Sequence, residues 1–244
     1  QIFFLSLSVY TRQLYAIVFL YLVYLYFLRL DKKIFLQSCF VIFLFSLPGF
    51  YFVSLLPNTL TLTFTTKIHN SIFVNLSILS FYLIPIFLIL FFNKKIIFNF
   101  LKKKKGYIFF IIMMVLLILS FWFDYNYKLG GGYFIKLSML LFNNLSIFFF
   151  SSIVGLFFCF YLCLENKNNI LIIALLIFGM TSYQIFQKYF EPMFLILLSS
   201  VINFEYLKNI LKSYRNIFLL NLYFFIYLFS AILNNIYKIT KNFV

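Results

Sequence analysis

The sequence predicts an all-α fold: a polytopic transmembrane helical bundle of about eight spans. Long apolar runs fill most of the 244 residues, and the few charged residues lie in the gaps between them. Hydrophobic residues make up 65% of the chain and charged residues 10%, which is too little polar surface for a water-soluble domain of this size. A backbone in lipid must satisfy its hydrogen bonds internally, and the alternating pattern of barrel strands is absent, so the runs are expected to be helices.

Each predicted span is an apolar run near the length that a membrane requires. About 20 apolar residues cross roughly 30 Å of hydrocarbon. The seventh run is short; it either extends from near Tyr189 to Leu207 or forms a re-entrant segment. Pro48 and Pro85 lie inside two of the runs, where each can kink its helix. The eight predicted spans are Leu14–Leu30, Ile34–Leu56, Ser71–Phe92, Tyr107–Phe123, Leu145–Leu164, Ile170–Phe186, Pro192–Phe204 and Ile217–Leu233.

The most unusual local sequence, DYNYKLGGGYFIKL at Asp124–Leu137, follows the fourth run. Its three successive glycines, Gly130 to Gly132, free the backbone, so the pattern predicts a flexible polar segment outside the membrane. A plain flexible connector is the alternative. The next segment, Leu137–Asn144, ends in the pair Asn143–Asn144, which favours a helix that lies in the membrane interface over a continued crossing.

The chain has a net charge of +15, and the distribution of its basic residues over the loops indicates how it is oriented in the membrane. No nucleic-acid partner is expected. Lysine and arginine alternate by loop, and most of them fall on one side of the predicted spans. The positive-inside rule places that side, with the run Lys102–Lys105, in the cytoplasm. The loops around Arg12, Thr59–Asn70, Asp124–Lys136 and Lys188–Glu191 are then extracytoplasmic.

The chain carries no motif of a soluble enzyme, and its catalytic residue is unknown. It has one histidine, and its three cysteines lie inside apolar runs, where each is expected to act as a small hydrophobic residue. No metal site or cofactor is predicted; a divalent ion stays open, without a visible ligand set. Cations on the outer side would suit a lipid-carrier phosphate, although each singly also fits an interface anchor. The outer set is Arg12, Lys67, His69, Lys128, Lys136 and Lys188, with Asp124 and Glu191.

Two short motifs resemble GT-C superfamily multi-pass membrane glycosyltransferases, and in particular bacterial proteins of the dolichyl-phosphate-mannose mannosyltransferase-like type. The first is Tyr10-Thr11-Arg12-Gln13-Leu14-Tyr15, followed by an aromatic span, a short basic turn and a span ending Leu47-Pro48-Gly49. The second is Gln187-Lys188-Tyr189-Phe190-Glu191-Pro192, which is similar to the aromatic entry to a late span in such enzymes. Leu14-Tyr15 replaces the Thr-Asn of the eukaryotic glucosyltransferases, so that particular activity is not implied.

The resemblance implies transfer of a sugar from a polyprenyl-phosphate donor at the extracytoplasmic face. It implies that Arg12 and Lys188 contact the donor phosphate with Tyr189 beside them, and the outer charge set adds Lys128. His69, Asp124 and Glu191 are further candidate polar contacts. The acidic catalytic residue of such enzymes lies in an earlier outer loop, so residues 1–244 are expected to be a single transmembrane domain, the C-terminal part of a longer protein.

A non-enzymatic alternative remains open from the same sequence. The chain also fits a lipid-carrier or polymer transporter, with Asn75, Gln184 and Asn221 as candidate lining residues, or an organelle-encoded respiratory-complex subunit. The expected location is an integral, multi-pass position in a bacterial inner membrane, in preference to an organelle membrane. The expected partners are the lipid bilayer and a polyprenyl-phosphate-linked sugar.

Overall fold

A computed structural model describes residues 16–55, 68–91, 105–126, 130–178, 185–202 and 212–242, and within these ranges the chain is helical without strands. The all-α prediction is therefore confirmed for the described residues. The helices there are α2 (Ala16–Arg29), α3 (Lys32–Leu55), α5 (Ile68–Phe91), α7 (Lys105–Ser120), α8 (Gly132–Phe142), α9 (Ser146–Glu165), α10 (Asn169–Phe178), α11 (Gln187–Ser200) and α13 (Tyr214–Asn242).

Every predicted span overlaps one of these helices, but the count of eight crossings is not established by them. By length and composition, three described stretches could cross a membrane: Ile68–Ile89 in α5, Ser146–Glu165 in α9 and Tyr214–Leu233 in α13. The described helix α10 is only ten residues long. The prediction of one span through Phe186 is wrong at its end, because Phe186 has extended backbone and directly precedes α11.

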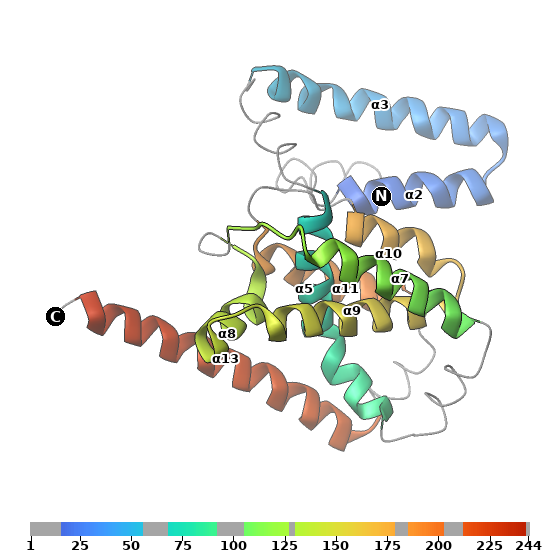
Figure 1. The fold of residues 1–244 in the computed structure, drawn as a ribbon. Coiled ribbons are helices and arrows are strands. Elements are labelled where there is room, and N and C mark those ends of the chain that lie inside the picture. The colour runs from blue at the N-terminus through green and yellow to red at the C-terminus, as the bar shows by residue number, and fades with distance from the viewer. Residues whose placement is uncertain are drawn as a thin grey trace.

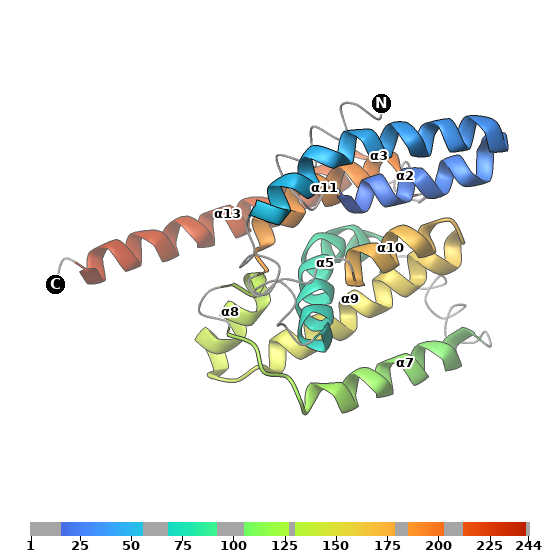
Figure 2. The same ribbon diagram turned by 90° about the horizontal axis from the view of Figure 1, so that it is seen from above.

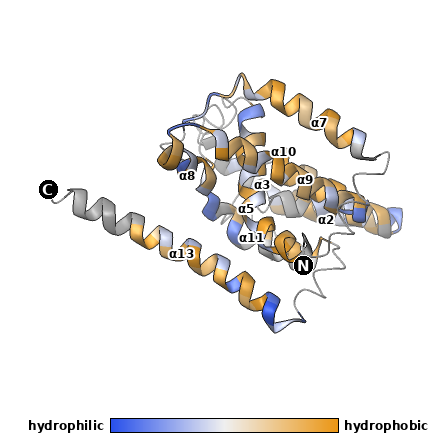
Figure 3. Cartoon of the chain, turned by 60° about the horizontal axis from the view of Figure 1, so that its bottom comes forward, coloured by the Kyte–Doolittle hydropathy of each residue, from blue (hydrophilic) through white to orange (hydrophobic). Residues whose placement is uncertain are grey.

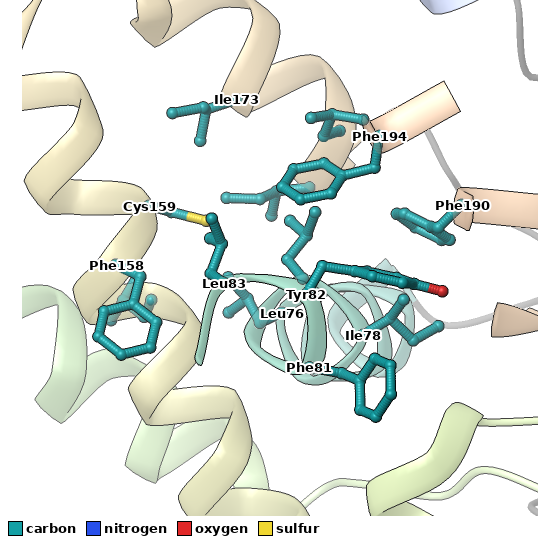
Figure 4. Close-up of a cluster of buried hydrophobic side chains, with 14 of the residues drawn as sticks. Leu76, Ile78, Phe81, Tyr82, Leu83, Phe158, Cys159, Ile173, Phe190 and Phe194 are labelled. Carbon is teal, nitrogen blue, oxygen red and sulfur yellow. The ribbon is translucent and has the colours of Figure 1, made fainter. Parts of the chain in front are cut away.

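Helix α5 is the centre of the molecule (Figures 1 and 2). It is apolar on all sides, which is the pattern of a helix surrounded by other helices. Nearly every side chain from Phe73 to Phe87 is buried. Helices α8, α9, α10 and α13 all pack against it. Figure 4 shows α5 side chains including Leu76, Tyr82 and Leu83 meeting residues of α9, α10 and α11.

Small residues bring α5 and α9 close together. Gly155 faces the backbone of Leu76, where a Cβ atom would stand 2.1 Å from the carbonyl oxygen. One turn earlier on α9, the Ser152 hydroxyl donates to the Phe73 carbonyl at 2.9 Å. Ser151 shares a buried 2.7 Å hydrogen bond with Ser77. Close backbone approach with hydroxyl hydrogen bonds is typical of helix pairs in lipid, where apolar side chains alone provide little drive to associate.

The triple-glycine segment is part of the packed interior, so the prediction of flexibility is wrong for Gly130–Gly132. All three glycines are buried. Gly131 and Gly132 have φ of 93° and 81°, which is left-handed backbone that favours glycine. Helix α8 begins at Gly132, five residues before the predicted interfacial helix at Leu137, and packs on α5 and α9. The short helix is confirmed, with an earlier start.

The peripheral helices are α2 and α3, which form a hairpin, and α13, which runs out along one side (Figures 1 and 2). Figure 3 shows that hydrophobic residues predominate in α13 between its hydrophilic start and the grey part at its end. In α13, Phe225, Leu228 and Phe229 are all more than half exposed. Apolar side chains at such exposure suit contact with lipid.

Candidate functional site

Segments predicted on the outer side of the membrane meet at the beginning of α5. The ring of His69 donates from Nε2 to the Trp122 carbonyl at 2.8 Å, because a carbonyl can only accept. Asn70 is buried and bonds both backbone groups of Asp124: its Nδ2 donates to the carbonyl, and its Oδ1 accepts from the N–H at 3.2 Å. Hydrogen bonds therefore hold residues 68–70 and 122–124 together, and we call this contact the joint. It agrees with the prediction that both segments lie on the outer side of the membrane.

We expect Asn70→Leu to loosen this joint. The substitution removes the partners of two part-buried backbone groups of Asp124, and each unpaired group costs about 1–3 kcal/mol. The free energy of unfolding in detergent micelles should fall by about 2 kcal/mol, and the Asp124 amide should exchange its hydrogen faster. Asn168→Ala, at an exposed asparagine, is the control and should change neither measurement. Unchanged exchange at Asp124 in the Asn70 variant would contradict the assignment.

The chain between this joint and α8 is held against the residues that precede α11. The Tyr125 hydroxyl accepts from the Ile185 N–H at 2.9 Å. The Gly131 N–H donates to the Ile185 carbonyl at 2.9 Å. The Tyr133 N–H donates to the Gln187 Oε1 at 2.8 Å. These bonds fix the first residues of α8 and α11 side by side.

The meeting point of α8 and α11 lies beside the interior of α5, away from its ends. A Cβ atom on Gly132 would stand 2.8 Å from Cγ1 of Ile78, and the Tyr82 hydroxyl lies 3.5 Å from the Gln187 carbonyl. At 1.5 Å per residue, Tyr82 is about 21 Å along a helix of about 36 Å. Helix α11 thus begins next to the middle of α5, as a re-entrant segment would.

A set of polar and aromatic side chains gathers there, which we call the polar–aromatic cluster. The Glu191 carboxylate lies close enough to act electrostatically on the hydroxyls of Tyr82 and Tyr227. The rings of Tyr133 and Tyr227 have centroids 5.4 Å apart. The cluster consists of Tyr82 from α5, Tyr133 from α8, Gln187 and Glu191 from α11, and Tyr227 from α13.

The structure places the sequence-predicted phosphate ligands only in part. Arg12 and Lys128 lie outside the described residues, as does the side chain of Tyr189. Lys188 is exposed, with its ammonium nitrogen 5.3 Å from the ring centroid of Phe186. The structure therefore does not assemble the four predicted donor-phosphate residues into one described site.

The three predicted polar contacts separate into two groups. His69 and Asp124 are joined to each other's segments near the start of α5. The sequence predicted Glu191 in a loop, at the end of Lys188–Glu191, and this prediction is wrong. Glu191 lies within α11 beside Tyr82, because the helix begins at Gln187. The ionisable group of the cluster thus lies deeper along α5 than the sequence indicated.

Tyr82, Tyr133, Gln187 and Tyr227 were not singled out from the sequence. Gln187 stands in one of the two motifs discussed above, which was the one available signal. The three tyrosines are among 19 in the chain, and nothing in the sequence distinguishes them from the others. Figure 4 shows Tyr82 extending from α5 toward α11.

Asn75, a candidate transporter-lining residue, holds two helices together. It is fully buried, and its Nδ2 donates to the Ile177 carbonyl of α10 at 2.8 Å. Asn221 is exposed on α13, and Gln184 lies outside the described residues. Cys159 is buried in the core, as expected of a small hydrophobic residue. Among the described residues, no three acidic, histidine or cysteine side chains group as metal ligands would.

In the part of the chain that the structure describes, fold and site together define an all-helical architecture with three candidate membrane-crossing helices and an internal polar–aromatic cluster. No protein-family model matches the chain, and no curated protein or solved structure matches it.

Proposed function

We propose that this chain belongs to a multi-pass membrane protein, of about eight spans, that acts on a polyprenyl-phosphate-linked sugar. The observation that supports this proposal is the polar–aromatic cluster, which holds the ionisable side chain of Glu191 within the helix bundle. Polar and ionisable groups are expensive in lipid and generally mark a substrate site. Glu191 and Gln187 are such groups, and they lie beside the middle of α5.

The activity we propose is glycosyl transfer at the extracytoplasmic face of a bacterial inner membrane. The acceptor hydroxyl attacks the anomeric carbon of the sugar, the bond to the polyprenyl phosphate breaks, and the hydroxyl proton passes to a base. The phosphate leaves with the electron pair of that bond. Lys188 is proposed to stabilise this anionic group, and its exposed position one residue after Gln187 supports that role. Arg12 and Lys128 are proposed as its companions.

Lysine substitution tests the phosphate contact. We expect Lys188→Gln to weaken binding of a radiolabelled polyprenyl-phosphate sugar about tenfold, because a charge-assisted hydrogen bond contributes about 1.5 kcal/mol or more. The measurement is equilibrium binding to the protein in lipid discs, followed by chromatography of the lipid fraction for sugar release. Lys167→Gln is the matched control: this lysine is also exposed but lies on the predicted cytoplasmic side. Equal loss in both variants would contradict a specific contact.

A second candidate, transport of the same lipid-linked sugar without chemistry, is favoured by the depth of the cluster. Substrate sites of transporters lie near the bilayer midplane, often where a helix begins inside the membrane. Helix α11 begins beside the middle of α5 in this way. Movement of a labelled polyprenyl-phosphate sugar across proteoliposomes, with no sugar transferred to any acceptor, would favour transport over glycosyl transfer.

A further inference from the structure

The Gln187 side chain has an unused hydrogen-bond donor within the polar–aromatic cluster. Its Oε1 accepts from the Tyr133 N–H at 2.8 Å. Because a backbone N–H can only donate, this bond fixes which end of the amide is oxygen. The other end, Nε2, lies near the Tyr82 hydroxyl but makes no hydrogen bond of normal geometry among the described residues, although Gln187 is only 8% exposed. A buried donor without a partner costs about 1–3 kcal/mol, so an acceptor is expected there when the site is occupied.

A strong acceptor faces the same place from the next turn of α11. The carboxylate of Glu191 is four residues after Gln187, on the same helix face. It is partly exposed and acts on the hydroxyls of Tyr82 and Tyr227. A ligand at this point therefore meets an N–H that must donate, a carboxylate that must accept, and tyrosine hydroxyls that can do either.

These requirements favour a neutral ligand group that both donates and accepts a hydrogen bond. A phosphate would satisfy Gln187 but would be repelled by the Glu191 carboxylate. An alkylammonium group would attract Glu191 but has no lone pair with which to accept from Gln187. A neutral hydroxyl does both, since it donates one hydrogen and accepts through its oxygen.

The surrounding side chains indicate what the rest of a ligand with such hydroxyls would be like. The Phe81 ring lies 4.7 Å from the Tyr227 ring and 5.4 Å from the Tyr133 ring, centroid to centroid. The Tyr82 ring lies 5.7 Å from that of Phe194. These rings contact one another and form an apolar wall beside the polar groups, and a sugar ring offers apolar C–H faces with hydroxyls at its edge.

We propose that the polar–aromatic cluster is a binding site for the hydroxyls of a neutral sugar ring, with Gln187 donating, Glu191 accepting and Tyr82 bridging them. This inference deepens the proposed function and rests on it for the lipid link of the sugar. The phosphate of the carrier belongs outside the cluster, because Glu191 opposes an anion there.

The test uses three classes of probe that share one tail and differ in the head group. Octyl β-glucoside, β-galactoside and β-mannoside, octyltrimethylammonium and monooctyl phosphate are radiolabelled and bound below micellar concentrations to the whole chain in lipid discs. We expect saturable binding at one site for at least one glycoside, and only non-saturable partition for the other two classes. Saturable binding of the ammonium or the phosphate, or of none of the glycosides, would overturn the proposal.

Four variants locate the site. Glu191→Gln replaces a charged acceptor with a weaker neutral one, and Tyr82→Phe removes a hydroxyl, so each should weaken glycoside binding about tenfold. Gln187→Glu keeps the acceptor for Tyr133, removes the donor and adds a negative charge one turn from Glu191, so it should weaken binding at least as much. Tyr161→Phe is the matched control: its ring packs 5.4 Å from that of Phe87, near the other end of α5 and away from the cluster, so affinity should be unchanged. Wild-type affinity in Glu191→Gln, a partly exposed position that is expected to tolerate the change, would overturn the proposal.

Binding and transfer can fail separately. Glycoside binding that depends on Glu191, without any transfer from a lipid-linked sugar, retains this site and removes the transferase proposal. Transfer that is unaffected by all three cluster variants removes this site and retains the transferase proposal.

Discussion

Replacing Gly155 with leucine is expected to separate α9 from α5 and to destabilise the protein more than any other single change considered. A Cβ atom at this position would stand 2.1 Å from the carbonyl oxygen of Leu76 and 2.9 Å from its carbonyl carbon. Both are backbone atoms of the central helix, so no side chain can rotate away to make room. Overpacking of a tight interface typically costs about 1–3 kcal/mol, and here whole helices must move, so the upper end or more is expected.

The measurement is the free energy of unfolding in mixed micelles, for Gly155→Ala and Gly155→Leu. Alanine should already destabilise the fold, because the clash involves Cβ itself, and leucine should do so further. Phe150→Leu on the same helix is the control, since Phe150 is 67% exposed and does not face α5. A Gly155→Ala variant as stable as the wild type would show that α5 and α9 do not approach so closely.

The sequence predicted the helices well because each helix is determined by residues within its own segment. Each apolar run is long enough to fold into a helix in lipid, where backbone hydrogen bonds must close within the segment. The approximate bounds of α5 and α9 follow from this alone. Gly155, in contrast, looked like any glycine in an apolar run, since the backbone it must approach is about 80 residues away in the chain.

The candidate site was harder to predict because it depends on how far segments reach into the bundle. Asp124, Lys188 and Glu191 were placed together in loops from their charge. The structure separates them: Asp124 lies beside Asn70 at the start of α5, and Glu191 lies beside Tyr82 well along it. Charge patterns report on which side a loop lies, but not on the depth at which the next helix begins.

The prediction that the glycines before α8 are flexible is wrong for a different reason. Three glycines in series permit flexibility, but they equally permit left-handed backbone and close packing, and the two uses have the same sequence. Only the neighbours distinguish them. Gly130, Gly131 and Gly132 are enclosed by Tyr125, Ile185, Ile135 and Ile78, none of which is adjacent to them in sequence.

Replacing Gly132 with valine is expected to have the second-largest effect, because two costs coincide there. Its φ of +81° disfavours any L side chain by about 1–2 kcal/mol. A Cβ atom would also stand 2.8 Å from Cγ1 of Ile78 on α5. Together these should lower the free energy of unfolding by about 3 kcal/mol. The Tyr133 N–H, which donates to Gln187, belongs to the next residue, so the polar–aromatic cluster should be disturbed as well.

A double-mutant cycle separates the two costs. Ile78→Ala shortens the side chain that a Cβ on Gly132 would strike, so it should relieve the steric part of Gly132→Ala and leave the φ part unchanged. We therefore expect the two substitutions to couple, with Gly132→Ala costing less in the Ile78→Ala background by about 1 kcal/mol or more. Additive free energies of unfolding would contradict contact between the start of α8 and the middle of α5. That contact is what places α11, and with it Gln187 and Glu191, inside the bundle, so the cycle also tests the depth on which the sugar site depends.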